Sequence, residues 1–397
     1  MTRARTDPGA GPGVAALPPL ADIRWLEGIN VVEVTTAVSA PLVGRVLAEL
    51  GAEVVKVESR AKPDVNRARL PRPADPEGFP AHEAFQLLHE ASASKRSVTL
   101  NLKTEAGLEL FLDLLHDADV FIENFVPGWL DRLGLSIQAL RERFPRLVIL
   151  SASGYGQTGP LRTQRSYAPV MSALAGVEGL IGYDDGEVLG CSALALADLN
   201  CSFYGVFLVA AALRGREETG QGCHVDLSQI EAASTLAGEA FAEHGLGGTR
   251  PRPRGNADPD GTPWTLMPAK AGPRTGWVAA AGQGDDLGTD APGADRWPRD
   301  ELLARLAARG VEAAPVLTPD DVAEDPGFAA RGFTQRIGHP HPLVGELHVT
   351  SIPWYLDGEL PRVRGTAPLL GGDNAAVLTR YLSQDQLSTL EQQGALR

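Results

Sequence analysis

Short β-branched runs alternate with amphipathic stretches along the first 156 residues. One run lies at 29–35 and a second at 53–58. Between them, Leu42, Val46 and Leu50 recur at helical spacing before a glycine. Such runs predict buried strands, and apolar residues four apart predict one face of a helix. A strand, a helix and a strand of this length favour a right-handed crossover between parallel strands.

The same alternation continues toward residue 156. We expect strands at 97–102, 119–125 and 146–156, with helices at 104–118 and near 128–142. This order is typical of an α/β fold with a doubly wound parallel sheet. Ligands of such folds bind where the strands deliver their carboxyl ends.

The second half predicts fewer elements. The mostly apolar stretch at 198–214 indicates a buried helix, and a strand at 223–227 is followed by another helix. Beyond residue 247 the chain is rich in loops until RDELLARLAARG at 299–310, which has the period of an amphipathic helix. VEAAPVL after it predicts a strand.

We therefore expect four segments. A flexible N-terminal arm at 1–22, rich in Pro and Gly, precedes a large α/β domain at 23–245. A reduced small α/β domain follows at 246–345, and the C-terminal segment 346–397 is expected to return to the large domain. At 397 residues, the chain is longer than one hydrophobic core usually serves.

Acidic residues outnumber basic ones, 50 to 36, which gives a net charge of −14. The field of such a chain repels polyanions, so we expect no nucleic acid and no anionic membrane as a partner. No uninterrupted apolar run reaches the roughly 18 residues of a membrane span. The first twenty residues lack the apolar core of a signal peptide, so we expect a cytoplasmic protein.

Three cysteines, Cys191, Cys201 and Cys223, lack metal-ligand spacing and lie in or beside apolar stretches. They are expected to be small buried hydrophobes rather than a disulfide framework. Cys223 stands next to His224, but adjacent residues of a strand point to opposite faces, so the pair does not predict an activated thiol. HPHP at 339–342 lacks a third ligand, and we expect no metal.

Basic residues gather around two predicted strands. Lys95 and Arg96 precede the strand at 97–102, and five basic side chains crowd the loop at 60–72. Guanidinium and ammonium groups suit phosphates, so both segments favour a site for a phosphorylated small molecule. The alternative is a solvated charged loop.

Five segments, in order, carry a family resemblance. They are VVEVTTAVSAPLVGRVLAELGAEVVKVES, KRSVTLNLKTEAG, ADVFIENFVPGWLDRLGL, RLVILSASGYGQTGP and GREETGQGCHVDLSQIEA. Together they resemble the class III CoA-transferase family, which includes formyl-CoA transferase, carnitine CoA-transferase and α-methylacyl-CoA racemase. The resemblance implies a Rossmann-like large domain, a small domain and two chains interlaced into a homodimer. It also implies an acyl-CoA or carrier thioester as substrate, and no metal.

The resemblance also assigns residues. Lys95 and Arg96 match the family's basic pair, which helps hold the CoA phosphates. Asn124 and Phe125 match its ENF motif, which lines the CoA channel. Many members continue this motif with arginine, but Val126 stands here, which removes a phosphate or carboxylate partner.

The catalytic aspartate of the family has no counterpart. It lies in a GYD-like turn eight residues before a glycine, and counting back eight from Gly176 reaches Ala168. A methyl group can neither attack a thioester nor move a proton. Tyr167 beside it is a candidate for a phenolic hydrogen bond or proton, with ordinary packing as the alternative. Asp184 and Asp185 form a turn to which nothing gives a catalytic geometry.

Two further features bear on the chemistry. Asp198 matches a recurrent family aspartate beside the long helix. The stretch between RTGWVAAA and GVEAAPV is several tens of residues shorter than is usual in the family, so we expect recognition of the acyl group to differ.

From these residues we expect an enzyme that acts on an acyl-CoA thioester by isomerisation, elimination or rearrangement rather than by ordinary two-step transfer. One alternative is a catalytically inactive subunit that binds a CoA ester or serves dimerisation. Another is a pocket that now serves a ligand unrelated to CoA.

Overall fold

The structure is a computed structural model, and it describes residues 20–68, 81–183, 188–191, 194–248, 250–258, 261–272, 274–283, 287 and 297–396. Contacts divide the chain into two compact units. The first comprises residues up to 175, 193–236 and from 329 onward, and the second comprises 176–192 and 237–328. Most of the predicted arm at 1–22 lies outside the described residues.

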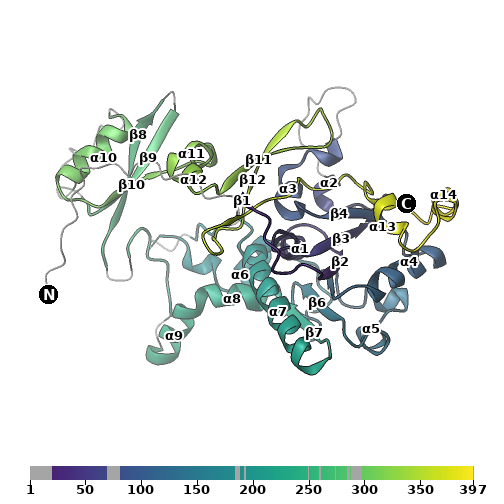
Figure 1. The fold of residues 1–397 in the computed structure, drawn as a ribbon. Helices are drawn as coiled ribbons and strands as arrows, with labels where there is room; N and C mark the ends of the chain where they lie inside the picture. Colours follow the sequence, from purple (N-terminus) through teal and green to yellow (C-terminus); the bar gives the residue numbers. More distant parts are fainter. Residues whose placement is uncertain are drawn as a thin grey trace. The chain divides into compact units, whose positions relative to one another are not determined.

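The first unit is built on a six-stranded parallel sheet (Figure 1). Its order is β4-β3-β2-β5-β6-β7, with every neighbouring pair parallel. The strands are β2 Asn30–Val34, β3 Glu53–Glu58, β4 Arg96–Thr99, β5 Val120–Glu123, β6 Val148–Ser153 and β7 His224–Ser228. The predicted α/β fold with a parallel sheet is confirmed, and the strand order reverses between β2 and β5.

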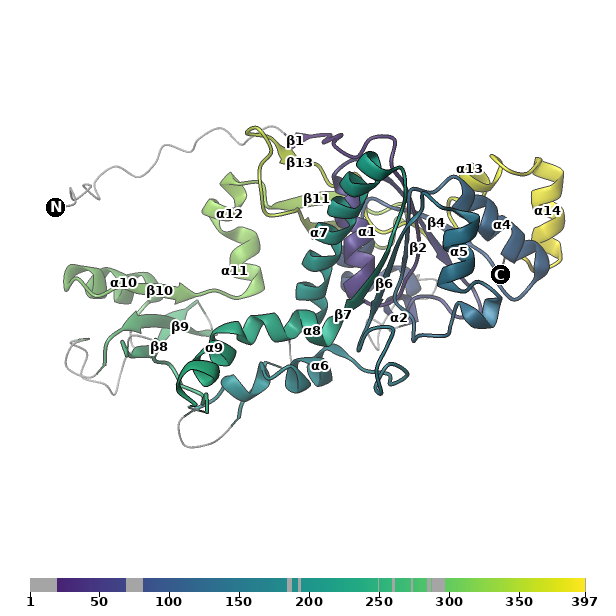
Figure 2. The same ribbon diagram turned by 90° about the horizontal axis from the view of Figure 1, so that it is seen from below.

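Helices cover both faces of this sheet. Figure 2 shows α1 (Ser39–Glu49) and α7 (Leu196–Thr219) on one face, and α4 (Glu105–His116) and α5 (Ile137–Arg143) on the other. Each helix was expected from its apolar period or composition. This arrangement buries the sheet on both sides, which parallel sheets require because their crossover helices lie on the faces.

The side chains of each strand alternate between the two faces of the sheet, so the core consists of two clusters. Val31 of β2 packs in the cluster under α1 and α7, and Val32 packs in the cluster under α4 and α5. Both valines are almost fully buried. Successive side chains of a strand point to opposite faces, so a strand covered on both sides is apolar throughout. This explains why these strands appear in the sequence as continuous β-branched runs.

The remaining helices and strands of the first unit are short. They are α2 Val65–Ala68, α3 Gln86–Ser92, α6 Ala168–Leu174, α8 Gln229–Ser234, α13 Asn374–Leu378, α14 Gln384–Gln392, the parallel pair of β1 Leu20–Ala21 and β13 Leu360–Pro361, and the antiparallel pair of β11 Thr334–Gly338 and β12 Glu346–Thr350. Val377 and Leu387 bring the C-terminal segment into the core cluster under α4. The HPHP segment lies in the loop that joins β11 to β12.

The helix expected near 128–142 is shorter than predicted, because α5 begins only at Ile137. A 3₁₀ turn at Asp131–Leu133 is separated from α5 by Gly134, which adopts a left-handed φ of 73°. Ser136 then caps α5, because its side chain accepts a hydrogen bond from Ala139 N at 3.1 Å. A left-handed glycine and a serine N-cap are stop and start signals, and together they outweigh the apolar period across the break.

Helix α7 is apolar on its exposed side as well as its buried side. Leu199, Phe203 and Phe207, one turn apart, are 40%, 53% and 67% exposed. By length and composition α7 could cross a membrane, and 33% of its most apolar 18-residue window is buried. The sequence analysis predicted a helix here but counted only uninterrupted apolar runs. Asp198 and Asn200 break the run, yet the mean hydropathy of the helix stays high enough for a possible membrane span.

The second unit contains a three-stranded antiparallel sheet with the order β10-β9-β8. Its elements are α9 Gly238–Gly247, β8 Trp264–Ala271, β9 Arg274–Ala281, α10 Arg299–Ala308, β10 Ala313–Val316, α11 Pro319–Glu324 and α12 Pro326–Ala330, the last at the boundary with the first unit. Leu302 and Leu306 of α10 pack with Val278 in a small core. The helix predicted at 299–310 and the strand after it are confirmed.

Candidate active site

Because strand order reverses between β2 and β5, the carboxyl ends of these two strands are the expected ligand position. Asn124 directly follows β5, and its side chain bridges the two strands. Its Oδ1 accepts a hydrogen bond from Thr36 N at 2.9 Å, and its Nδ2 donates to Thr36 O at 2.8 Å. This predicted site residue therefore lies at the reversal point and fixes the loop after β2.

The loop after β2 is held in a left-handed conformation at Ala37, whose φ is 66°. Ala37 N donates to Asp64 Oδ1 at 3.2 Å, and Asn66 Nδ2 donates to Ala37 O at 2.7 Å. A non-glycine residue keeps such a conformation only where the surroundings hold it from several sides. The entry of the chain into α1 is therefore rigidly defined.

Beneath this loop, two lysines share one buried carboxylate. Lys95 Nζ lies 2.7 Å from Glu33 Oε1, and Lys56 Nζ lies 3.6 Å from the same oxygen and 3.0 Å from Asp64 Oδ2. All four side chains are almost fully buried. Burial lowers the pKa of Lys95 to about 8, while the charge of Glu33 acts in the opposite direction. The Lys95 ammonium is thus engaged inside the fold.

Lys95 and Arg96 point away from each other. Arg96 begins β4, and its Nε lies 3.5 Å from Glu53 Oε1 at the amino end of β3. Lys95 instead donates to Pro41 O at 2.5 Å, in the first turn of α1. Neighbouring residues at the start of a strand face opposite sides of the sheet. The structure does not bring this predicted pair together, and its role toward CoA phosphates stays a prediction.

Three exposed cations lie where two adjacent strands end. Arg60 and Lys62 follow β3, and Lys103 follows β4, which pairs with β3 in parallel. Cations at the carboxyl ends of neighbouring parallel strands can reach the same bound anion. Sequence reasoning included Arg60 and Lys62 in a basic loop but missed Lys103. Its position just after a predicted strand was the available signal.

Phe125, the other predicted channel residue, stacks on Trp129 with ring centroids 4.4 Å apart. Its N–H donates to Glu123 Oε2 at 2.9 Å. Burial raises the pKa of Glu123, against a hydrogen bond from Ser151 that lowers it. The Ser151 hydroxyl also lies 3.1 Å from His224 Nε2. A chain of polar groups therefore runs from β5 to β7 and holds the turn at Phe125.

A small cavity of about 30 Å³ lies beside Glu123 and is also lined by Trp129 and Gln157. The buried Nε2 of Gln157 has no hydrogen-bond partner within the described part of the chain. A volume of this size holds about one water molecule. This cavity can hydrate the Glu123 carboxyl, but it is too small for a substrate.

Helix α6 begins at the position predicted for the missing nucleophile. Ala168 is its first residue and is only 5% exposed, whereas Tyr167 before it is 70% exposed. The first turn of α6 has no acidic residue. Tyr167 is thus accessible rather than packed in the core, and its catalytic role stays a prediction. Asp184 and Asp185 lie outside the described residues.

Asp198 lies in the first turn of α7, and α7 packs against α6. Burial raises the pKa of Asp198 to about 6. A carboxyl group that changes its charge near neutral pH can accept or release a proton under working conditions. Sequence reasoning singled out Asp198 by resemblance alone, because burial is a tertiary property.

Known proteins were compared with the chain. The family model for CoA-transferase family III matches residues 26–289 and 294–374. The chain belongs to this family. Formyl-CoA:oxalate CoA-transferase from Streptomyces avermitilis is 30% identical over 94% of this chain and 100% of its own length. Succinate–glutarate CoA-transferase from Agrobacterium fabrum is 29% identical over 78% of this chain and 84% of its own length.

Solved structures agree with this membership of CoA-transferase family III. A CaiB/BaiF family protein from Brucella suis has 30% identity and a TM-score of 0.78, covering 90% of this chain and 99% of its own. A hypothetical protein from Mycobacterium tuberculosis, at 23% identity and a TM-score of 0.68, covers 92% of this chain and 100% of its own and shares the fold. The family recognised from five sequence segments is confirmed.

Proposed function

We propose that this family III CoA-transferase chain binds an acyl-CoA thioester and acts on it without an aspartyl nucleophile. The observation that carries the proposal is the start of α6, where Ala168 is buried and no acidic residue stands in the first turn. Without a carboxylate there, α6 cannot supply the mixed anhydride of two-step transfer. The proposed chemistry is an isomerisation, elimination or rearrangement, in which a proton moves while the CoA thioester persists.

Asp198 is the proposed acid–base group. It stands in the first turn of α7, the helix that packs on α6, and burial raises its pKa to about 6. The carboxylate form therefore predominates above that pH and can take a proton from the carbon next to a thioester carbonyl. The exposed phenol of Tyr167 is available to hydrogen-bond the same carbonyl.

The CoA phosphates are proposed to bind Arg60 and Lys103. Both side chains are exposed, and they follow the carboxyl ends of the adjacent strands β3 and β4. Lys95 is less suited to the role because its ammonium is buried between Glu33 and Pro41. Asn124 and Phe125, at the neighbouring strand end, are proposed to line the channel for the pantetheine arm.

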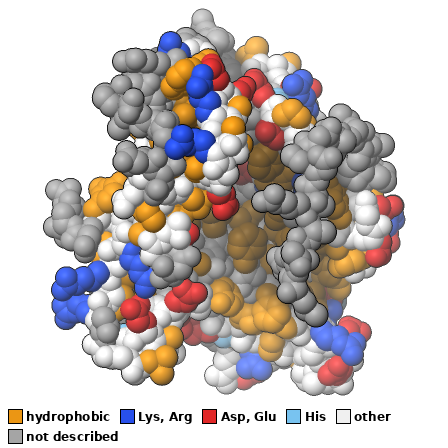
Figure 3. All heavy atoms as spheres, turned by 90° about the vertical axis from the view of Figure 1, so that its left-hand side faces the viewer, with side chains coloured by type: hydrophobic (Ala, Val, Ile, Leu, Met, Phe, Trp, Pro, Cys, Tyr) orange, Lys and Arg blue, Asp and Glu red, His pale blue; other side chains and the backbone are white. Residues whose placement is uncertain are grey.

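A homodimer is part of the proposal. Leu199, Phe203 and Phe207 expose an apolar face along α7. On the face drawn in Figure 3, hydrophobic side chains also form continuous areas between the charged ones. Soluble chains cover faces of this kind with a partner, and a second copy of this chain is the proposed one. We also propose a cytoplasmic location, because the three cysteines are free thiols.

The test is incubation of the protein with a panel of acyl-CoAs in deuterated water, followed by mass spectrometry. We expect deuterium to enter the acyl group next to the thioester, or the acyl group to be rearranged, while CoA stays attached. Asp198→Asn should slow this exchange by about 10²-fold or more. Glu218→Gln, which changes an exposed carboxylate on the same helix, should not. Transfer of CoA between two carboxylic acids would contradict the proposal.

A second candidate function is a CoA-ester-binding subunit without catalysis of its own. The missing carboxylate on α6 is compatible with it. One relative in the family is the alpha subunit of succinyl-CoA–L-malate CoA-transferase from Chloroflexus aurantiacus, 28% identical over 90% of this chain. Calorimetric binding of acyl-CoA with no chemical change in the mass spectra would favour this candidate. Absence of binding to any CoA species would point to a ligand unrelated to CoA.

A further inference from the structure

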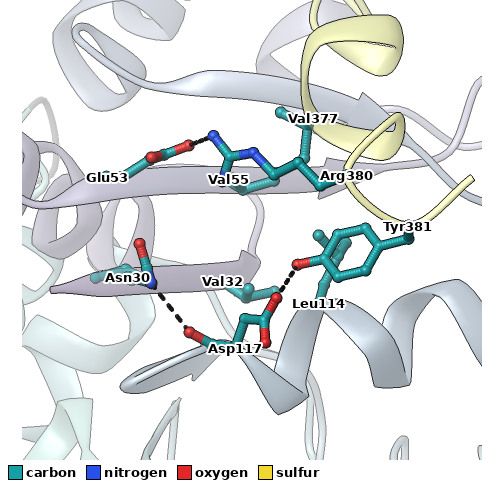
Figure 4. A pocket seen from close by; sticks show the side chains of 10 residues that line it. Asn30, Val32, Glu53, Val55, Leu114, Asp117, Val377, Arg380 and Tyr381 are labelled. Carbon is teal, nitrogen blue, oxygen red and sulfur yellow. Dashed lines mark hydrogen bonds and ion pairs between the residues drawn. The ribbon is translucent and has the colours of Figure 1, made fainter. Parts of the chain in front are cut away.

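A cavity of about 250 Å³ opens at the amino edge of the parallel sheet, where β2 and β3 begin (Figure 4). The proposed acyl-CoA site lies at the carboxyl edge, so the two places are distinct. Aliphatic side chains make part of the lining: Val32, Val55, Leu114 and Val377. The cavity is smaller than the roughly 300–1,000 Å³ of a drug-sized site, so it fits a small metabolite.

Polar side chains lie at two sides of this cavity. On one side, Arg380 Nη2 donates to Glu53 Oε1 at 2.6 Å (Figure 4). On the other side, the Tyr381 hydroxyl donates to Asp117 Oδ2 at 2.8 Å, and Asn30 Nδ2 donates to Asp117 O at 3.1 Å. The polar groups are therefore held in place by one another, with the aliphatic lining between them.

The free acceptors at this cavity favour a ligand that donates hydrogen bonds. Two carboxylates, Glu53 and Asp117, face the cavity with Arg380, and Arg96 also pairs with Glu53, so both nearby guanidiniums are already engaged. Helix α4 ends at His116, and the carbonyl end of a helix adds partial negative charge. Within the described residues, neither Glu53 Oε2 nor Asn30 Oδ1 accepts a hydrogen bond. Both oxygens remain available to a donor that enters the cavity.

We propose that this cavity is a binding site for a short-chain primary alkylammonium ion. An ammonium group has three donors and no acceptor, which matches the free oxygens of Glu53 and Asn30. The alkyl chain would lie against Val32, Val55 and Leu114, where burial of its methylene groups is favourable. A carboxylate of the same size would meet Glu53 and Asp117, and the guanidiniums of Arg380 and Arg96 are both already paired with Glu53 Oε1.

Isothermal titration calorimetry with n-butylammonium tests the site, with n-butyrate and 1-butanol as matched ligands. We expect saturable binding of n-butylammonium and none of n-butyrate. Glu53→Gln should weaken that binding about tenfold or more, because a neutral amide replaces the charge-assisted acceptor. Glu27→Gln makes the same chemical change at an exposed carboxylate paired with Arg24, outside the cavity, and should leave the affinity unchanged.

The proposal is overturned if n-butylammonium shows no saturable heat, if n-butyrate binds as tightly, or if both variants keep the native affinity. A crystal of the native protein soaked in n-butylammonium is the second measurement, should Glu53→Gln fail to fold. Density within hydrogen-bond distance of Glu53 and Asn30 supports the site, and density elsewhere or none overturns it. Neither outcome touches the acyl-CoA proposal, which is read by mass spectrometry at the other edge.

Discussion

Lys95 and Lys103 stand on either side of β4, yet they meet different surroundings. Lys95 is buried and binds Glu33 and Pro41, whereas Lys103 is exposed beyond the carboxyl end of the strand. A charged group inside the fold is bound by its internal partners, so it is a stability determinant. A charged group at the surface retains its donors for a ligand.

Lys95→Ala and Lys103→Ala are therefore expected to have separate effects. Lys95→Ala should lower the free energy of unfolding by about 3–5 kcal/mol, because it removes a partner of the buried Glu33 carboxylate. Lys103→Ala should leave stability nearly unchanged and weaken CoA binding by about 1–3 kcal/mol, the scale of a lost charge-assisted hydrogen bond. Urea denaturation measures the free energy of unfolding, and calorimetry with CoA measures the affinity. Full stability with lost CoA affinity in Lys95→Ala would restore the assignment made from the sequence.

Asp198 is expected to make stability depend on pH. Its pKa is about 6 in the folded chain against an ordinary value of 3.8, so the folded state holds the proton more tightly between these values. The stabilising contribution is fully present below pH 3.8 and is lost as pH rises through about 6. The loss should reach about 2–3 kcal/mol.

Urea denaturation between pH 4 and pH 7 measures this loss in the native chain and in Asp198→Asn. The amide does not titrate, so the variant should lack this part of the pH dependence. Identical profiles for both chains would show that the carboxyl of Asp198 is not desolvated in solution.

At the scale of elements, close packing decides what each helix tolerates. Helix α7 carries two interior glycines with opposite surroundings. A Cβ added at Gly205 would lie 2.6 Å from Val43 Cγ2 of α1, whereas one added at Gly215 would meet nothing within 4 Å. The first glycine permits the contact of α7 with α1, and the second has no such role.

Alanine substitution at the two glycines should therefore change stability in opposite directions. Gly205→Ala should destabilise the protein by about 1–3 kcal/mol, because the methyl group overpacks the contact with Val43. Gly215→Ala should stabilise it by up to about 1 kcal/mol, the difference in helix propensity between the two residues. Thermal and urea unfolding of both variants measure this. Stabilisation by both substitutions would mean that α7 and α1 are less closely packed than described.

At the scale of the whole molecule, the exposed apolar face of α7 is the feature that an isolated chain leaves unexplained. Its other face packs in the core, through Cys201 and Val209. A helix that is apolar all round is normally buried all round. Association of two chains through this helix would complete that burial.

Multi-angle light scattering after size-exclusion chromatography tests the association. The native chain should elute as a dimer, and Phe203→Glu combined with Phe207→Glu should give a monomer, because two charges would then stand on the apolar face. Leu161→Glu, at a position 46% exposed in the loop between β6 and α6, should leave the dimer intact. A native monomer, or a dimer that survives the double substitution, would contradict the proposed assembly.

Much of the fold was predictable because its signals are local. Strand β3 was predicted at 53–58, where the structure has it, and α4 and α10 were predicted to within two residues at each end. The hairpin of β11 and β12 was missed, because it has no extended apolar period. Among the candidate site residues, Asn124 was singled out by resemblance and directly follows β5 in the structure, and its role in a CoA channel stays a prediction.

The sequence by itself determined the order of strands and helices along the chain and the absence of a carboxylate at Ala168. These depend on residue period and on residue identity. Only the tertiary structure decided that Lys95 pairs with Glu33, 62 residues away, that Asp198 is desolvated, and that a cavity opens at the amino edge of the sheet. Burial and the choice of an ionic partner depend on groups brought together from distant parts of the chain, which no local pattern encodes.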